Sequence, residues 1–539
     1  MTDRVSRTFQ LSLQSITMKL IIILFTFFVI EFVQCVPLVD QILPASTEEA
    51  DDSSVRLWKS KVLGKKMKTY RLPNNSIPLR YDLWLKTEVD KEIFNFSGRV
   101  KIHIKVLEPT QIITLHMRRI VITKVDFLDV SGSLITGNIA FDYDKHFEFL
   151  ELTLPTQRNV NDELILDIAY TGVSKRDGLG FCHSSYRDFE DKQDVFYAST
   201  QFRMASLRYA MPCYDEPAIR AVIGLEIQHT RSYHAISNMP VVSRTDVDGT
   251  DHVTTKFQDT IAMPTYLLNF IIFNVDHVSN HMMNYGDFAV GFAGKVLRKF
   301  EELFGIDFPL AKMHDAAIDS DGAEAMENIE LPKYLEMILL KQPTISESAI
   351  MGEITFEIAN IYFGNIVASN WWSHVWLSEG LASLFEYCIS SLIDPKMYSI
   401  KKMKPLAAYA FEINDTTPLN FHAEIPWTIR KKFYKTSYRK SSAMLLMIME
   451  AMTKPTFMKG LKFFLTDMYL KAATPDDFHR NLQKAYDEDF PGNNVNLSAA
   501  MSSWEDQAGY PTIHVTKTNG GFLLNQTRLG GGSEVYSID

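Results

Sequence analysis

Residues 356–360 read FEIAN, a segment with the spacing of a zinc-binding helix motif. In that motif two histidines stand four positions apart, and a glutamate directly follows the first histidine. Glu357 keeps the glutamate, whereas Phe356 and Asn360 occupy the two histidine positions. Phenylalanine offers zinc no donor atom, and the neutral carbonyl of asparagine is a poor zinc ligand. The segment therefore has the form of a metal-binding helix that lacks two of its metal-binding groups.

The elements that must position this segment change along the chain from strands to helices. Up to about residue 275, alternating apolar residues with many β-branched side chains predict strands, among them 81–89, 98–106, 112–122, 147–154 and 163–170. From about residue 292 to 508, apolar residues three and four apart predict helices, among them 294–305, 345–365, 377–392 and 441–452. Residues 512–529 form a predicted hairpin around Asn519 and two glycines.

The N-terminal region has the features of a segment that directs secretion. Lys19 precedes an apolar run over residues 20–30, which is short for a membrane span and typical of a signal peptide. The same run extended to Leu38 could instead anchor the protein in a membrane. Glycosylation sequons begin at Asn74, Asn95, Asn414, Asn496 and Asn525. We expect a secreted protein or a type II membrane protein with an extracellular ectodomain.

Composition limits the function further. The net charge of -10 and the pI of about 5.8 argue against nucleic acid as a partner. The four cysteines are Cys35, Cys182, Cys213 and Cys388, and three of them remain after signal removal, so one disulfide beside one buried thiol is possible. The expected segments are 1–35 (signal peptide or anchor), 36–68 (linker or stalk), 69–275 (β domain), 276–508 (helical domain) and 509–539 (hairpin and tail).

Five motifs resemble those of the aminopeptidase N family of zinc exopeptidases, the gluzincin aminopeptidases, in the same order. They are MPCYDEPAIRA at 211–221, EAMEN at 324–328, FEIANIYFGN at 356–365, WWSHVWLSEGLAS at 371–383 and SYRKSSAM at 437–444. The resemblance covers about residues 69–539. It implies a multidomain α+β fold with an N-terminal antiparallel β-saddle domain, a thermolysin-like, mainly helical domain and the start of a C-terminal β-sandwich. Because the family continues beyond that sandwich, the chain is expected to be a truncated member.

The resemblance assigns the third zinc ligand to Glu379, which follows Asn360 after the 18 residues 361–378. Catalytic zinc needs three protein ligands, and Glu379 is the one that remains. His374, where the family has an aspartate, could in principle move in beside Glu379. We expect instead that Phe356 packs in the core and that the protein carries no catalytic zinc and no other cofactor.

The resemblance also assigns two catalytic roles that depend on that metal. Glu357 matches the glutamate that activates a zinc-bound water, and Tyr438 matches the tyrosine that stabilises the oxyanion. Without a metal there is no acidified water for Glu357 to activate. One oxyanion donor contributes about 3–4 kcal/mol and cannot replace the nucleophile. Both residues are therefore expected to be vestigial.

Substrate capture is altered at two further positions. By resemblance the substrate-binding residues are Gln201, Arg203, Glu324, Ala325, Met326, Glu327 and Asn328. Arg203 replaces a glutamate or glutamine that faces the substrate's amino group, and Glu324 replaces a glycine that lets the peptide approach. We expect Arg203 and Glu324 either to pair inside the empty amino-group site or both to point to solvent.

These observations predict an aminopeptidase N-like pseudo-peptidase that binds peptides or a protein partner. A working zinc metallo-aminopeptidase with a rearranged metal site is the alternative, and a non-functional product of a degenerating gene is a third reading. Retention of Glu357, Glu379 and Tyr438 weakly opposes the third. The oligomeric state stays open.

Overall fold

The computed structural model describes residues 69–137, 139–187, 192–274, 280–310, 313–318, 325–336, 346–395, 417–423, 425, 428–429, 435–509, 511–518 and 521–528. The expected signal or anchor segment, the linker, Glu324 and Asn414 lie outside these ranges. Contacts divide the chain into one unit over Met1–Arg71 and a second over Leu72–Asp539. Within the described part of the chain, no helix is both long and apolar enough to cross a membrane.

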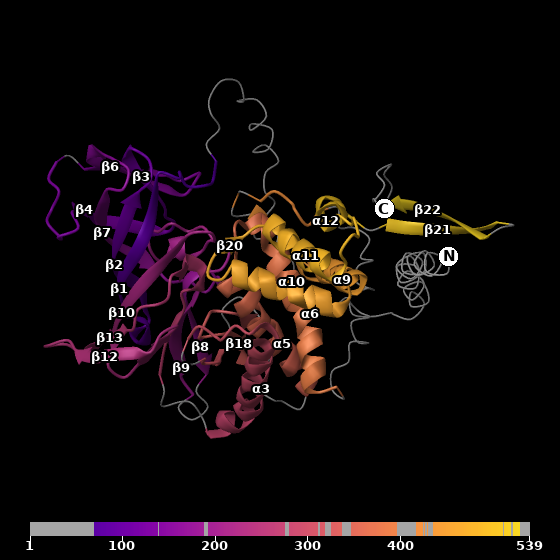
Figure 1. The fold of residues 1–539 in the computed structure, drawn as a ribbon. Helices are drawn as coiled ribbons and strands as arrows, with labels where there is room; N and C mark the ends of the chain where they lie inside the picture. Colours follow the sequence, from indigo (N-terminus) through magenta and orange to yellow (C-terminus); the bar gives the residue numbers. More distant parts are fainter. Residues whose placement is uncertain are drawn as a thin grey trace, which may run out of the picture. The chain divides into compact units, whose positions relative to one another are not determined.

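The N-terminal part of the second unit consists mainly of strands (Figure 1). An eight-stranded sheet contains β1 (Ser76–Glu88), β2 (Ile93–Val106), β4 (Ile120–Leu128), β7 (Glu163–Val173), β10 (Arg220–Thr230), β12 (Val241–Asp246), β13 (His252–Phe257) and β14 (Met263–Pro264). The strand order is β12-β13-β10-β1-β2-β7-β4, with β14 beside β10. The pairs in this sheet are antiparallel except β1 and β10, which run parallel.

Two smaller antiparallel sheets complete this part. The first contains β8 (Gly180–Arg187), β9 (Asp194–Gln201), β11 (His234–Ser237) and β15 (Phe270–Phe273). The second contains β3 (Thr110–His116), β5 (Ala140–Asp144) and β6 (Phe149–Arg158). The predicted single run 112–122 is thus wrong: β3 and β4 are separate strands in different sheets, and Arg119 between them has a φ of 59°.

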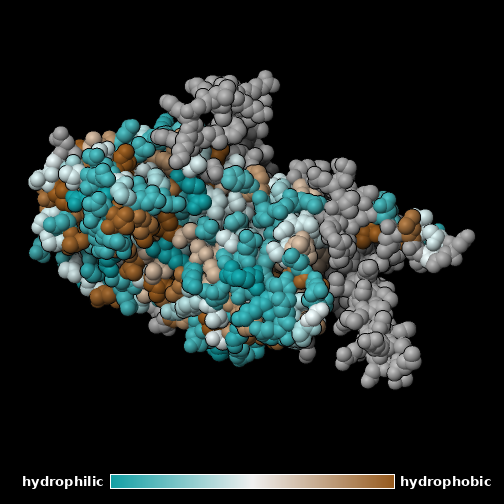
Figure 2. All heavy atoms as spheres, turned by 45° about the horizontal axis from the view of Figure 1, so that its top comes forward, coloured by the Kyte–Doolittle hydropathy of each residue, from teal (hydrophilic) through white to brown (hydrophobic). Residues whose placement is uncertain are grey.

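Alternating residues of β1 explain how the large sheet covers the core. Tyr81, Leu83 and Leu85 are buried, whereas Asp82 and Trp84 lie on the opposite, partly exposed face. On the side shown in Figure 2, hydrophobic side chains also gather in surface patches over this β-rich part, while the helical part is mostly hydrophilic.

The C-terminal part of the second unit is mainly helical (Figure 1). It contains α3 (Asn280–Phe304), α5 (Glu347–Asn360), the π-helical turn η4 (Ile361–Ile366), α6 (Val375–Ile393), α9 (Lys435–Met452), α10 (Lys454–Asp467), α11 (Pro475–Asp489) and α12 (Leu497–Asp506). A small sheet of β16 (Ala316–Ile318), β18 (Lys333–Leu335) and β17 (Ala325–Met326) lies before α5. After α12, the described residues end in a hairpin of two strands, β21 (Pro511–Thr518) and β22 (Gly521–Arg528).

The central helices of this part are buried on several sides. Ile350, Ile354 and Ile358 of α5 belong to a core that also includes Leu381 and Phe385 of α6. The hydroxyl of Ser346 caps α5 by accepting a hydrogen bond from the amide of Ala349 at 3.3 Å. The predicted α+β arrangement, a β-rich part followed by a helical part, is confirmed.

Cys182, Cys213 and Cys388 are buried, and no disulfide joins them to one another. The disulfide that the cysteine count allows is therefore not formed among the described residues.

Candidate functional site

Helix α5 carries the altered metal motif into the interior. Glu357 and Asn360 are buried, and Phe356 is half-buried. Directly after Asn360 the helix continues as the π-helical turn η4, an irregularity that is frequent at functional sites. The predicted helix over 345–365 is thus one α-helix followed by a π-turn.

Helix α6 places Glu379 beside this motif. The Glu379 side chain is fully buried. The next residue, Gly380, packs against Ser441 of α9, and a Cβ atom at Gly380 would lie 2.6 Å from the Ser441 side chain. This close approach of α6 and α9 places Tyr438, one turn before Ser441, near the Glu379 carboxylate. Burial raises the pKa of the Tyr438 hydroxyl, and the charge of Glu379 raises it further.

Arg203 brings a positive charge into the site from the β-rich part. It follows the last residue of β9, Gln201, by two positions. Its Nη1 lies 2.7 Å from Glu327 Oε1 and donates a hydrogen bond to Glu327 Oε2 at 2.8 Å. Its Nη2 donates to Glu379 Oε1. One guanidinium therefore joins two carboxylates that come from two different elements of the helical part.

Glu327 lies in the loop after β17, and hydrogen bonds to neighbouring segments fix the backbone of this loop. The side-chain amide of Asn365, in η4, donates to the carbonyl of Glu327 at 2.5 Å. Asn328 Nδ2 donates to the carbonyl of Leu267 at 3.3 Å. The Glu327 side chain is 1% exposed, so its carboxylate is set in a dry environment where an ion pair is strong.

Burial and neighbouring charges shift pKa values in the Arg203 cluster, by which we mean Arg203, Glu327, Glu357 and Glu379. Burial raises the pKa of Glu357 well above its usual range, and the Glu327 carboxylate raises it further, so the neutral form of Glu357 is favoured. Burial also raises the pKa of Glu379, to about 7, although Arg203 and Asn360 favour its charged form. Burial would lower the pKa of Arg203, but Glu327 and Glu379 raise it above its ordinary value, and the guanidinium stays charged.

The residues present do not fit a catalytic zinc ion. Phe356 packs against Tyr438 and supplies no donor atom. Glu379, the carboxylate that remains, is bound to Arg203. His374 ends the short helix η5 (Trp372–His374), and no group of three or more His, Cys, Asp or Glu side chains in the described ranges is arranged to hold a metal. A ligand set of three is not assembled.

One expected pairing stays a prediction. Arg203 contacts Glu327 and Glu379 through its two Nη groups, and its pairing with Glu324, expected from the sequence, is not tested by the described residues. Glu324 itself lies outside the described residues. Of the other predicted substrate-binding residues, Gln201, Met326 and Asn328 are buried around the cluster, and Ala325 is partly exposed.

Three residues that support the site were not singled out from the sequence. Asn365 holds the Glu327 backbone, and the Tyr266 hydroxyl donates to the carbonyl of Gly364 at 2.6 Å. Arg220 donates from Nη2 to the carbonyls of residues 365 and 366 at 2.8 and 3.1 Å. Asn365 and Arg220 both lie within the motifs at 356–365 and 211–221, which was the available signal.

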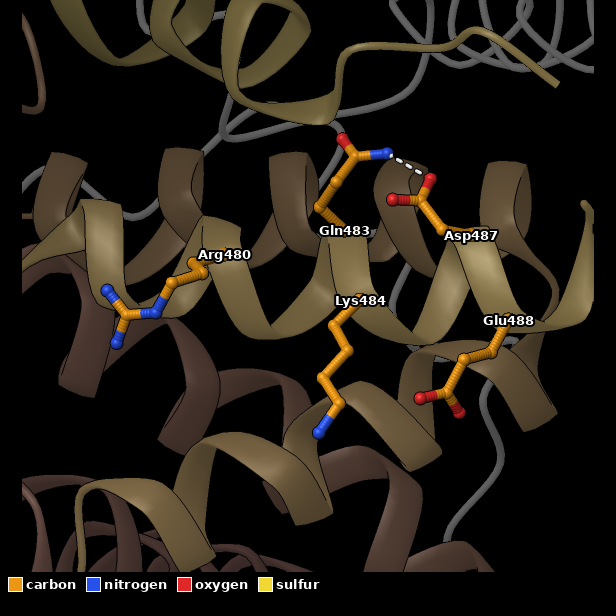
Figure 3. Close-up of a pocket in the computed structure, with 5 residues that line it drawn as sticks. All are labelled: Arg480, Gln483, Lys484, Asp487 and Glu488. Carbon is orange, nitrogen blue, oxygen red and sulfur yellow. Dashed lines mark hydrogen bonds between the residues drawn. The ribbon is translucent and has the colours of Figure 1, made fainter. Parts of the chain in front are cut away.

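A surface hollow of about 530 Å³ lies elsewhere, along α11. Figure 3 shows its lining side chains projecting from one helix, with Gln483 donating to Asp487 at 2.8 Å. Its lining residues are Arg480, Gln483, Lys484, Asp487 and Glu488, and none belongs to the Arg203 cluster. The hollow is open and formed by a single helix, so we assign it no part in the site.

Comparison with known proteins matches both parts of the chain. The peptidase M1 N-terminal domain matches residues 77–267, and the peptidase family M1 domain matches residues 288–504. Endoplasmic reticulum aminopeptidase 1 of Rattus norvegicus is 28% identical over 510 residues, covering 86% of this chain and 54% of that protein.

Two other curated relatives give the same result. Glutamyl aminopeptidase of Homo sapiens is 28% identical over 519 residues, covering 92% of this chain and 51% of that protein. Puromycin-sensitive aminopeptidase of Caenorhabditis elegans is 26% identical over 477 residues, with coverages of 84% and 49%. The chain spans about half the length of the curated relatives it matches.

Proposed function

Because the chain belongs to peptidase family M1, we propose that it is a pseudo-peptidase of the secretory pathway, which binds peptides or a protein partner without hydrolysing them. The observation that carries the proposal is the contact between Arg203 and Glu379. The carboxylate that a catalytic metal would need is neutralised by a side chain of the same protein.

The remaining catalytic-type residues support this proposal. Hydrolysis in this family requires an activated water and a base that accepts its proton. Glu357 is buried, and burial raises its pKa well above the usual range, which favours the neutral carboxyl group over the charged carboxylate that a base needs. The Tyr438 hydroxyl, whose pKa burial also raises, could donate one hydrogen bond to an oxyanion, which does not supply a nucleophile.

The amino-group pocket is also unsuited to an aminopeptidase substrate. Glu327, which by resemblance would bind the free α-amino group, is engaged by the Arg203 guanidinium. An incoming ammonium would meet a like charge in a buried setting, where the repulsion is strong. A peptide that binds here is therefore expected to do so without using a free N-terminus.

The cellular location in this proposal has three supports. The apolar run over residues 20–30 has the length and flanks of a signal peptide. One similar protein is named for the endoplasmic reticulum. Of the sequon asparagines, Asn74, Asn95 and Asn496 are exposed, as glycan attachment requires.

The decisive experiment measures zinc content and peptidase activity on the purified wild-type protein. We expect far less than one zinc per chain and no cleavage of aminoacyl fluorogenic amides. Rat endoplasmic reticulum aminopeptidase 1, purified in the same way, serves as the active control. One equivalent of zinc per chain, with activity that a chelator removes, would instead establish a metallo-aminopeptidase with a rearranged site.

A second experiment addresses binding. Fluorescence anisotropy should compare peptide pools with free and with acetylated N-termini. We expect the acetylated pool to bind at least as well, because Arg203 already occupies the Glu327 carboxylate that would bind an ammonium. A clear preference for free N-termini would contradict the proposal.

A further inference from the structure

We propose that Glu327 and Glu379 form a guanidinium-binding site, which the protein fills with its own Arg203. The inference rests on the proposed function, since it takes the Glu379 carboxylate to be free of metal. It goes beyond that function by naming the cation that the two carboxylates select.

The contacts match the shape of a guanidinium group. Nη1 of Arg203 lies against both carboxylate oxygens of Glu327, and Nη2 reaches Glu379 Oε1 on the other side. A planar fork can bridge two separate carboxylates in this way, whereas an ammonium is a compact point charge. The geometry therefore favours guanidinium over other monovalent cations.

Burial strengthens the preference of the site for guanidinium over ammonium. Arg203 is 12% exposed, and Glu327 and Glu379 are 1% and 0% exposed. A guanidinium is more weakly hydrated than an ammonium, so it loses less hydration when it enters such a site. If the cation were absent, two buried carboxylates would face each other without compensation, which is strongly unfavourable.

The backbone beside Arg203 shows that this arrangement is maintained against local strain. The next two residues, Met204 and Ala205, have φ values of 65° and 62°, in the left-handed region that side chains other than glycine's disfavour. Such strain persists where the surrounding contacts over-determine the conformation. Here the two carboxylate contacts are among the interactions that hold the arginine in place.

Chemical rescue tests the proposal directly. In Arg203→Ala the side chain is removed but the two carboxylates remain, so the free guanidinium ion can enter the vacated space. Thermal unfolding of this variant should be followed in millimolar guanidinium chloride, with sodium chloride and ammonium chloride at the same ionic strength. We expect guanidinium alone to raise the unfolding midpoint of Arg203→Ala, in a saturable manner, because a ligand that binds the folded state stabilises it. The wild-type midpoint should not rise.

Arg99→Ala is the matched control. Arg99 also makes paired hydrogen bonds with one carboxylate, Asp167, but its side chain is 56% exposed. Guanidinium should not stabilise that variant measurably beyond sodium chloride. Equal effects of guanidinium and sodium chloride on Arg203→Ala would overturn the proposal. So would a larger rise with zinc that a chelator reverses.

Arg203→Lys provides a test if Arg203→Ala does not fold. Lysine keeps the charge but cannot bridge both carboxylates, so its midpoint should lie clearly below that of the wild type. A lysine variant as stable as the wild type would show that the site selects charge alone, and would refute the inference. Zinc in the wild-type protein would count against the proposed function, whereas failed rescue with a zinc-free wild type would count against this inference only.

Discussion

The ring of Phe356 packs against the ring of Tyr438, with the ring centroids 6.0 Å apart and the ring planes inclined by 38°. Phe356 stands at the first histidine position of the motif, and Tyr438 at the position of an oxyanion donor. The two positions that by resemblance would hold a metal ligand and an oxyanion donor are here joined by an aromatic contact. The loss of the metal ligand is thus accommodated by packing.

Restoring zinc should require three substitutions. Phe356→His with Asn360→His returns two donors on one face of α5, but Arg203 still holds Glu379. Adding Arg203→Gln frees that carboxylate. We expect calorimetry to show zinc binding by the triple variant at least about 10-fold tighter than by the double variant, the range typical of interactions that orient metal ligands. Equal affinities would mean that Arg203 does not control Glu379.

Glu357→Gln should change how stability depends on pH. The pKa of Glu357 is raised in the folded protein, so the folded state binds an extra proton above the unfolded pKa, and stability falls as pH rises through this window. For one such group the slope is about 1.4 kcal/mol per pH unit. Glutamine mimics the neutral form, so the variant should gain stability relative to wild type as the pH rises above the unfolded pKa of about 4.3.

Urea unfolding at several pH values provides the measurement. Glu302→Gln is the control, because the Glu302 side chain is 64% exposed and its substitution should leave the pH profile unchanged. Parallel profiles for Glu357→Gln and wild type would show that Glu357 is charged in the folded protein.

Gly380→Ala should destabilise the contact between α6 and α9. Its Cβ would lie 2.6 Å from the Ser441 side chain, and overpacking of this kind costs about 1–3 kcal/mol. Gly291→Ala in α3 is the matched control, since outside the helix's own backbone no described residue lies within 4 Å of its added Cβ, and alanine favours the helix by about 0.5–1 kcal/mol. Denaturant unfolding should therefore give opposite signs for the two variants, and equal signs would disprove the packing argument.

Arg220→Met should loosen the contact between β10 and the end of the η4 turn. Its Nη2 donates in a partly buried setting to the carbonyls of Asn365 and Ile366, and burial lowers the Arg220 pKa to about 10. Leaving these carbonyls without a donor should cost about 1–3 kcal/mol in urea unfolding. Arg231→Met, which removes an exposed pair with Asp246, should cost under about 1 kcal/mol. Similar losses for both variants would contradict the role assigned to Arg220.

Much of the architecture could be predicted from local pattern. Burial in β1 alternates with period two, and the apolar spacing of 345–365 marks a buried helix, because one face or stripe must pack against the core. The break between β3 and β4 and the π-turn after Asn360 were missed. Both depend on backbone conformations that hydrophobic periodicity does not encode.

The absence of zinc-donor atoms at positions 356 and 360 can be recognised from the sequence alone, because the residue type decides which side-chain atoms are present. The partners of Arg203 cannot be recognised in this way, because Glu327 and Glu379 lie 124 and 176 residues away along the chain. The sequence suggested that a new cation had entered the amino-group pocket. Which carboxylates it binds was decided by the packing of β9 against the helical part, since the fold determines which distant charges share a dry environment.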